Sequence, residues 1–317
     1  MGTRWRCISG WIGFLAVLAG FLAASPALAA GDPTGTATLA KDPNAAVNFI
    51  WVLLTGACVI FMMTGFAMVE TGFTRARHAN NTMMMNLMVW AVGGFAFALI
   101  GFALMFGGVG GAFGPLDKLL TVKIAGRAWG LLGLKGFGLL DVYDVSVFLL
   151  FFFQVAFLDT ALTIPSGAMA ERIKFSSYLV YAFLAGCFIY PLFGNWAWGG
   201  GWLAQLGQIG LGGGYKDFAG SGAVHAVGGL MGLAGAMALG PRIGKFVKGK
   251  PVAIPGHDLG MGVLGTMLLI FCWFSFNCGS TFAATDLRLA VVGVNTLLAG
   301  CAGPRVRPTP TAGGRPR

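Results

Sequence analysis

The sequence predicts an all-α polytopic membrane protein. Of its 317 residues, 56% are hydrophobic and only 10% are charged, whereas soluble domains carry about 25% charged residues. The mean hydropathy is +0.78. The apolar residues gather in long stretches, each close to the roughly 20 residues that a helix needs to cross a bilayer. The chain therefore has room for six or seven spans in one membrane domain and none for a sizeable soluble domain.

The first 30 residues have the pattern of a cleaved signal peptide. Arg4 and Arg6 precede an apolar run over about residues 11–22, and small residues around Ala29 then provide a cleavage site. An uncleaved first span is the alternative interpretation. Cleavage would leave residues 31–45 as a polar segment outside the cytoplasm.

Seven apolar stretches follow, and each predicts a spanning helix. They cover residues 46–69, 82–106, 146–169, 176–194, 222–240, 258–280 and 287–303. The composition then changes abruptly to Pro, Arg, Thr and Gly over residues 304–317. Such a segment cannot pack in a membrane. We expect an aberrant tail of a truncated or frame-shifted product, with a natural disordered terminus as the alternative.

Basic residues in alternate loops predict the orientation. Cytoplasmic loops of membrane proteins carry an excess of Lys and Arg. Three loops carry bare positive charge: Arg75/Arg77, Arg172/Lys174 and Arg242/Lys245/Lys248/Lys250. The other loops mix Lys with Asp. We therefore expect these three loops in the cytoplasm, the N-terminus outside, and the protein in the cell (inner) membrane.

One apolar stretch begins with two ionisable residues. Asp217 and His225 are eight residues apart and are followed by a run rich in Gly and Ala. An ionisable group inside a membrane is costly unless it is paired, and it marks a functional site by default. Small residues let neighbouring helices approach closely. The alternatives are that Asp217 caps a helix and that His225 bonds a carbonyl group of a neighbouring helix.

Three passages together resemble the ammonium transporter (Amt/Rh) family, over about residues 46–303. The passages are Phe153-Gln154-Val155-Ala156-Phe157 running to Gly167-Ala168-Met169-Ala170-Glu171-Arg172; Trp198-Gly199-Gly200-Gly201 leading to Asp217-Phe218-Ala219-Gly220 and His225; and Trp273-Phe274-Ser275-Phe276-Asn277-Cys278-Gly279-Ser280. The resemblance implies an eleven-helix bundle of two inverted five-helix repeats, assembled as a trimer with one pore in each subunit. This chain would supply the first five-helix repeat plus the start of the second.

The resemblance also implies an outer ammonium-binding site. Phe153 and Trp198 would form its aromatic wall, and Ser280 would accept a hydrogen bond. Aromatic faces attract a small cation by about 0.5–2 kcal/mol. The alternative is an interfacial aromatic belt, in which Trp196, Trp198 and Trp202 only mark the level of the headgroups.

Deeper in the implied pore, Phe157 and Phe276 resemble a stacked gate that excludes hydrated ions. His225 resembles the first of two pore histidines that handle protons. The second histidine would belong to the second repeat, and neither of the other histidines of this chain can replace it. Asp217 resembles the acid that supports the outer site without touching the cation.

Three further acids lie in or beside the apolar stretches. Glu70 and Glu171 are close in sequence to arginines, and we expect both to form ion pairs at the membrane boundary rather than to act as proton relays. Asp159 is less expected at its depth, and Thr160, Thr163 or a backbone group would be its partner.

The implied function is ammonium transport: ammonium is recruited and deprotonated, and ammonia crosses a hydrophobic pore. The alternative is a non-conducting truncated remnant or an ammonium-sensing membrane protein. An enzyme is not expected, because no nucleophile and base, or set of metal ligands, stand at helical spacing. We expect no cofactor and no metal, and the six cysteines resemble small buried apolar residues.

Expected partners follow from the same resemblance. They are ammonium or ammonia, two further copies in a homotrimer if the chain is complete, a trimeric nitrogen-regulatory signalling protein on the cytoplasmic face, and membrane lipid. The net charge of +10 does not predict nucleic-acid binding, because the basic residues are scattered over short loops and the tail.

Overall fold

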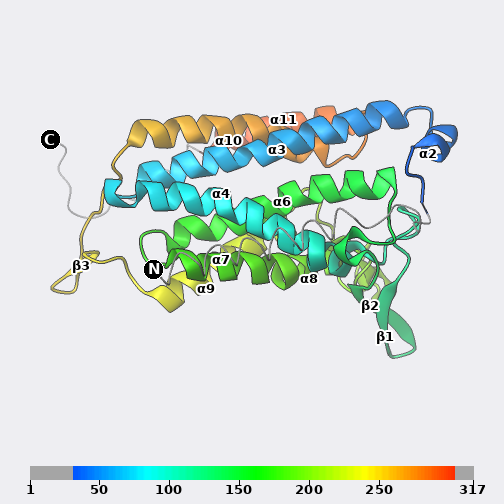
Figure 1. Cartoon of the computed structure of the whole chain (residues 1–317), viewed down its shortest axis with the longest axis horizontal. Helices are drawn as coiled ribbons and strands as arrows, with labels where there is room; N and C mark the ends of the chain where they lie inside the picture. Colours follow the sequence, from blue (N-terminus) through cyan, green and yellow to red (C-terminus); the bar gives the residue numbers. More distant parts are fainter. Residues whose placement is uncertain (1–30, 304–317) are drawn as a thin grey trace, which may run out of the picture.

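The computed structural model of the chain describes residues 31–303 and shows a bundle of long, roughly parallel helices (Figure 1). The expected signal peptide and tail, residues 1–30 and 304–317, lie outside the described residues. Within the described part, six helices are long and apolar enough to cross a membrane: Ala45–Phe73, Ala76–Phe106, Val145–Met169, Phe175–Ala197, Ser221–Leu239 and Leu259–Gly279. Six of the seven apolar stretches are thus confirmed as helices of spanning length.

The seventh stretch forms a shorter helix, α11 (Arg288–Ala302), of 15 residues. It would be about 22 Å long at 1.5 Å per residue, less than the roughly 30 Å of a bilayer core. The prediction of a helix is confirmed there, and the described helix is shorter than the other six.

The elements in chain order are α2 (Thr36–Lys41), α3 (Ala45–Phe73), η2 (Ala76–His78), α4 (Ala79–Ala96), η3 (Phe97–Gly101), α5 (Phe102–Phe106), β1 (Leu119–Ile124), β2 (Arg127–Gly133), η4 (Phe137–Leu139), α6 (Val145–Met169), α7 (Phe175–Leu184), η5 (Ala185–Ile189), α8 (Tyr190–Ala197), η6 (Ala204–Ile209), η7 (Ser221–Ala226), α9 (Val227–Leu239), β3 (Phe246–Val247), β4 (Lys250–Pro251), α10 (Leu259–Gly279) and α11. In Figure 1, α3, α10 and α11 run along one side of the bundle and α7, α8 and α9 along the other. Helix α6 lies between them and is the most buried of the spans.

Helix α6 starts and packs for clear local reasons. The Asp144 side chain caps it by accepting the Ser146 N–H at 2.8 Å. Pro165 inside the helix has no N–H to give to the Ala161 carbonyl. Gly228 of α9 lies against that carbonyl, since a Cβ on Gly228 would be only 2.8 Å from the Ala161 oxygen. Small residues thus bring α9 close to α6.

Helices α3 and α10 also meet through glycines. A Cβ on Gly265 would lie 2.7 Å from the Gly65 carbonyl oxygen, and one on Gly65 would lie 2.8 Å from Leu269. Distances below 3 Å leave no room for a methyl group. The two backbones therefore touch, as expected for small residues between membrane helices.

The strands are the departure from the expected all-helical fold. β1 and β2 form an antiparallel hairpin in which Ile124 pairs with Arg127. The two turn residues, Ala125 and Gly126, have φ of 50° and 77°, which suits a tight hairpin turn. The hairpin lies at one end of the bundle, beside η6 (Figure 1).

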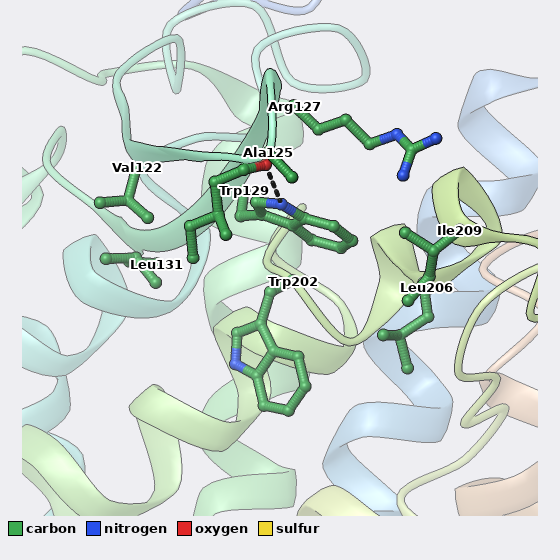
Figure 2. A pocket seen from close by; sticks show the side chains of 9 residues that line it. Val122, Ala125, Arg127, Trp129, Leu131, Trp202, Leu206 and Ile209 are labelled. Carbon is green, nitrogen blue, oxygen red and sulfur yellow. Dashed lines mark hydrogen bonds between the residues drawn. The ribbon is translucent and has the colours of Figure 1, made fainter.

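The hairpin and η6 enclose an apolar surface pocket of about 480 Å³. Figure 2 shows Trp129 of β2 and Trp202 around it, with Leu206 and Ile209 on the opposite wall. The Trp129 indole N–H donates to the Ile124 carbonyl at 3.4 Å across the hairpin. This pocket lies apart from the cavity described below.

The basic loops meet at the other end of the bundle. Glu171 accepts hydrogen bonds from the Arg75 backbone N–H (2.8 Å) and Nε (2.7 Å), and it lies 3.7 Å from Arg242. Burial alone would raise the pKa of Glu171, but the hydrogen bonds from Arg75 outweigh it, and the pKa lies below its ordinary value. The predicted ion pair of Glu171 is confirmed, and the three basic loops lie on one face.

Glu70 does not form the predicted ion pair. Its carboxylate lies against Ser166 of α6 and accepts a hydrogen bond from Asn86 of α4 at 3.0 Å. The prediction was wrong because Arg75 follows the end of α3, while Glu70 is inside the helix and points to the bundle interior.

Candidate functional site

A cavity of about 390 Å³ brings five of the seven predicted site residues together. Phe153 and Phe157 come from α6, Trp198 and Asp217 from the segment between α8 and η7, and Ser280 directly follows α10. Its walls include Phe153, Phe157, Trp198, Asp217 and Ser280, together with Gln154, Phe218 and Phe282. The sequence analysis did not identify the last three.

Trp198 is held in the cavity wall by its indole N–H, which donates to the Asp217 carbonyl at 2.7 Å. Trp196 and Trp202 contact each other instead, with ring centroids 5.6 Å apart, and Trp196 donates to the Leu131 carbonyl. The three tryptophans therefore have different surroundings. Only Trp198 lines the cavity, so the belt interpretation does not describe it.

The aromatic wall continues through Phe153 and Phe282. Their rings meet edge to face at 4.8 Å, and Phe153 also contacts Phe157 at 4.7 Å. Phe282 has φ of 55°, a left-handed conformation that is rare for bulky residues and tends to occur at functional sites. It follows the third family-like passage by two residues, which is the only hint of it in the sequence.

The Asp217 carboxylate anchors the start of the fifth span. Oδ1 accepts the N–H groups of Gly220 (2.7 Å) and Ser221 (2.9 Å), and Oδ2 accepts those of Gly222 (2.9 Å) and Ala223 (2.8 Å). These are N–H groups that a helix start leaves without partners. Asp217 is thus both a helix cap and part of the cavity wall, so its two predicted roles coincide.

Ser280 ends α10 beside the cavity. Its hydroxyl donates to the Phe276 carbonyl at 2.8 Å. The donor is used within the helix, so the oxygen lone pairs are left to accept a hydrogen bond from a group in the cavity. The acceptor role of Ser280 stays a prediction.

Phe157 and Phe276 form the floor below the cavity. Their rings are stacked with centroids 4.0 Å apart and an interplanar angle of 24°. Both side chains are almost fully buried. The predicted pair is therefore in contact, and the two rings close the path from the cavity toward His225.

His225 lies beyond this floor. It sits in the π-helical turn η7, where its N–H donates to the Gly220 carbonyl at 2.9 Å. Its ring stacks on Trp273 with centroids 5.2 Å apart and planes 9° apart, and it contacts Phe276 at 5.6 Å. Trp273 lies three residues before Phe276, on the same face of α10, a spacing that could have identified it.

A second cavity, of about 420 Å³, lies beside His225, and Phe218 lines both cavities. Asn277, Asn295 and Thr296 line it together with His225 and Trp273. Among the described residues, the other two histidines lie at the basic end: His78 contacts Arg77, and His257 Nδ1 lies 2.9 Å from the Thr74 carbonyl oxygen. In residues 31–303, Trp273 therefore stands beside His225 and no second histidine does.

The order along the bundle is an aromatic cavity, a stacked pair of phenylalanines and a histidine. An aromatic cavity with a hydroxyl acceptor suits a small cation. A dry aromatic floor admits a small neutral molecule more easily than a hydrated ion. Within the described residues, no group of three or more His, Cys, Asp or Glu side chains could hold a metal ion.

Comparison with known proteins identifies the family. The sequence model described as Ammonium Transporter Family matches residues 50–306. Ammonium transporter Amt2 of Archaeoglobus fulgidus is 48% identical over 285 residues, which are 87% of this chain and 56% of that protein. Ammonium transporter 1 member 3 of Solanum lycopersicum is 39% identical over 242 residues, 74% of this chain and 48% of that protein.

Solved structures of ammonium transporters also resemble this chain. A structure titled Sensor Amt Protein superposes with a TM-score of 0.70 at 32% identity, covering 83% of this chain and 61% of that chain. The crystal structure of Candida albicans Mep2 superposes with a TM-score of 0.64 at 30% identity, covering 81% and 52%. This chain spans about half the length of the curated relatives. The predicted fold class is confirmed, and this multi-pass membrane protein belongs to the ammonium transporter family.

Proposed function

We propose that the chain carries the ammonium-recruiting half of a transport pore. Ammonium binds in the cavity between Phe153, Trp198 and Ser280, loses its proton, and passes the Phe157–Phe276 floor as ammonia toward His225. The observation that carries this proposal is the alignment of the aromatic cavity, the stacked floor and the histidine in one line. The family membership supports the choice of substrate.

Each residue has a distinct part in this proposal. Phe153 and Trp198 stabilise the cation through their ring faces, and Ser280 accepts one of its hydrogens. Asp217 keeps Trp198 and the helix start in place. His225 exchanges a proton or a hydrogen bond with ammonia, as an imidazole can do near neutral pH.

The orientation and assembly are part of the proposal. The basic face of Arg75, Arg242 and their neighbours would lie in the cytoplasm of a cell (inner) membrane and the cavity outside, consistent with the positive-inside rule. The long apolar face of α3 and α10 would pack in a homotrimer. A trimeric nitrogen-regulatory protein would meet the basic face.

The test is uptake of radiolabelled methylammonium by cells that lack their own ammonium transporters. We expect uptake by cells that express the chain, and at least a tenfold loss in Trp198→Ala and in His225→Ala. Gly229→Ala is the control, because a Cβ there would meet nothing within 4 Å. Uptake that survives both alanine variants would refute the site assignments.

The second candidate is a non-conducting protein that binds or senses ammonium. Two observations favour it: the rings of Phe157 and Phe276 close the path, and no second histidine faces His225 among the described residues. The similar structure titled Sensor Amt Protein supports it too. Ammonium-dependent quenching of tryptophan fluorescence that is lost in Trp198→Phe, together with no uptake, would favour this function over transport.

A further inference from the structure

Helix α6 has a second polar face that the pore does not use. Asp159, Thr163 and Ser166 follow one another at spacings of four and three residues, so they lie along one stripe of the helix. Asp159 is two residues after Phe157, which at about 100° per residue turns it some 200° away from the floor of the cavity. The stripe therefore points away from the pore.

The lower end of the stripe meets Glu70 of α3. The Ser166 hydroxyl oxygen lies 2.5 and 2.6 Å from the two Glu70 carboxylate oxygens and 2.6 Å from the Thr163 carbonyl oxygen. A serine hydroxyl has one hydrogen and can serve only one of these acceptors well. A proton on Glu70 completes the arrangement, because Glu70 then donates to Ser166, which donates to Thr163.

The upper end of the stripe is Asp159, which is 3% exposed. Among the described residues, its Oδ1 has no hydrogen-bond partner, and neither has Thr163 Oγ1 or the Oδ1 of Asn86 beside Glu70. The Thr160 hydroxyl, one of its predicted partners, donates to the Ala156 carbonyl instead. Two buried acceptors, Asp159 Oδ1 and Asn86 Oδ1, thus lack a donor, and the Thr163 hydroxyl beside Asp159 lacks a partner as well, which is costly in an apolar interior.

Within residues 31–303, no cation pairs with either of these two acids. Helix α3 contributes Glu70, α4 contributes the amide of Asn86, and α7 contributes the phenol of Tyr178. Arg75, the nearest arginine in sequence, bonds Glu171 at the boundary. Glu70 and Asp159 can then be electrically neutral inside the bilayer only if each carboxylate binds a proton.

The stripe comes nearest to water at the basic face, where Glu70 is 9% exposed. Asp159 is ten residues before the end of α6, about 15 Å inside and so near the bilayer middle. Glu70 is three residues before the end of α3, next to the basic face. Above Asp159, Phe152 and Val155 continue the same helix face with apolar side chains.

We propose that Asp159, Thr163, Ser166 and Glu70 form a proton-binding half-channel that runs from the basic face to the middle of the bilayer, behind the pore. A proton leaves water at the basic face, binds a carboxylate to form the neutral acid, and returns to the same face. No proton is released on the other side, and the site needs no property of the pore. Intramembrane acids of this kind commonly bind or pass protons.

Infrared spectroscopy of the purified protein in lipid vesicles tests the proposal at neutral pH. Protonated carboxyl groups have a separate C=O stretching band, which shifts when the proton is replaced by deuterium. We expect bands from two buried protonated carboxyls, one lost in Glu70→Gln and the other in Asp159→Asn. Both bands should shift within minutes in D2O, because the proposed half-channel connects both carboxyls to water at the basic face.

Two further variants sharpen the test. Thr163→Val preserves the shape but removes the hydroxyl next to Asp159, and we expect at least a tenfold slower deuterium exchange of the Asp159 band only. Asp286→Asn removes an exposed carboxylate paired with Arg288 and should leave both bands unchanged. Circular dichroism and the gel-filtration profile check that each variant folds.

Two results would overturn the proposal. One is the absence of a protonated-carboxyl band at neutral pH in the unmodified protein. The other is a band that does not shift in D2O within hours, or that shifts at the same rate in Thr163→Val. None of these measurements depends on ammonium transport, so failure of the proposed transport function leaves this test intact.

Discussion

The four hydrogen bonds of Asp217 allow a quantitative prediction for Asp217→Asn. An amide keeps one oxygen, which can still accept the N–H groups of Gly220 and Ser221. Its NH2 group would face the N–H groups of Gly222 and Ala223, 2.9 and 2.8 Å from the present oxygen, and two bonds to a charged acceptor would be lost. Such bonds contribute about 1.5–3 kcal/mol each. At the lower end of that range, the free energy of unfolding falls by about 3 kcal/mol.

Asp258→Asn is the matched control. Asp258 caps α10 with a single bond from Oδ1 to the Met261 N–H, at 2.8 Å. Asn is about as good as Asp at such a position, and the loss should be below about 0.5 kcal/mol. Denaturant unfolding in mixed micelles, followed by tryptophan fluorescence, gives both values. Equal losses for the two variants would refute the reasoning, because the difference rests on the use of both carboxylate oxygens.

Three further predictions concern packing and pH. Phe276→Ala removes a fully buried ring from the floor of the cavity and should lower the free energy of unfolding by about 3–5 kcal/mol. It should also speed water flux through the protein in stopped-flow vesicle measurements. Unchanged water flux would contradict the claim that the two rings close the path below the cavity. Gly265→Ala forces a methyl group against the Gly65 carbonyl and should cost about 1–3 kcal/mol, whereas Gly229→Ala, with open space around it, should change stability by less than 0.5 kcal/mol either way. The lowered pKa of Glu171 means that its ionised form stabilises the folded protein at pH above about 4.3, the pKa of an unfolded Glu. Glu171→Gln should therefore have a lower melting temperature than the unmodified protein at neutral pH, and this difference should disappear as the pH falls through the folded pKa. A difference that persists at low pH would exclude the ion pair as its cause.

The spanning helices could be predicted because each depends on local sequence. Length and hydropathy fix a membrane helix almost without tertiary information, and six of the stretches became helices of spanning length. Asp217 could be predicted as a cap for the same reason. The stacked contact of Phe157 and Phe276 joins two distant helices, and only the family resemblance singled out these two among 27 phenylalanines.

Other features depend on contacts that the sequence does not reveal. Glu70 was assigned to an arginine that is near in sequence, but its true neighbours, Asn86 and Ser166, come from two other helices. Trp273 and Phe282 became part of the site through packing across α6 and α10. The β1–β2 hairpin did leave a local signal, since Thr121-Val122-Lys123-Ile124 alternates before the Ala-Gly turn, but the surrounding apolar composition favoured helices.

The way Asp217 holds the start of the fifth span also sets the electric field at the cavity. The helix from Ser221 to Leu239 begins there, and the aligned peptide dipoles of a helix place about half a positive elementary charge at its first turn. Left bare, that charge would repel an approaching cation. The Asp217 carboxylate accepts four of the N–H groups that carry this charge. Its full negative charge exceeds the partial positive charge of the helix start, so the same side chain that caps the helix makes the local field at the cavity favourable for a cation.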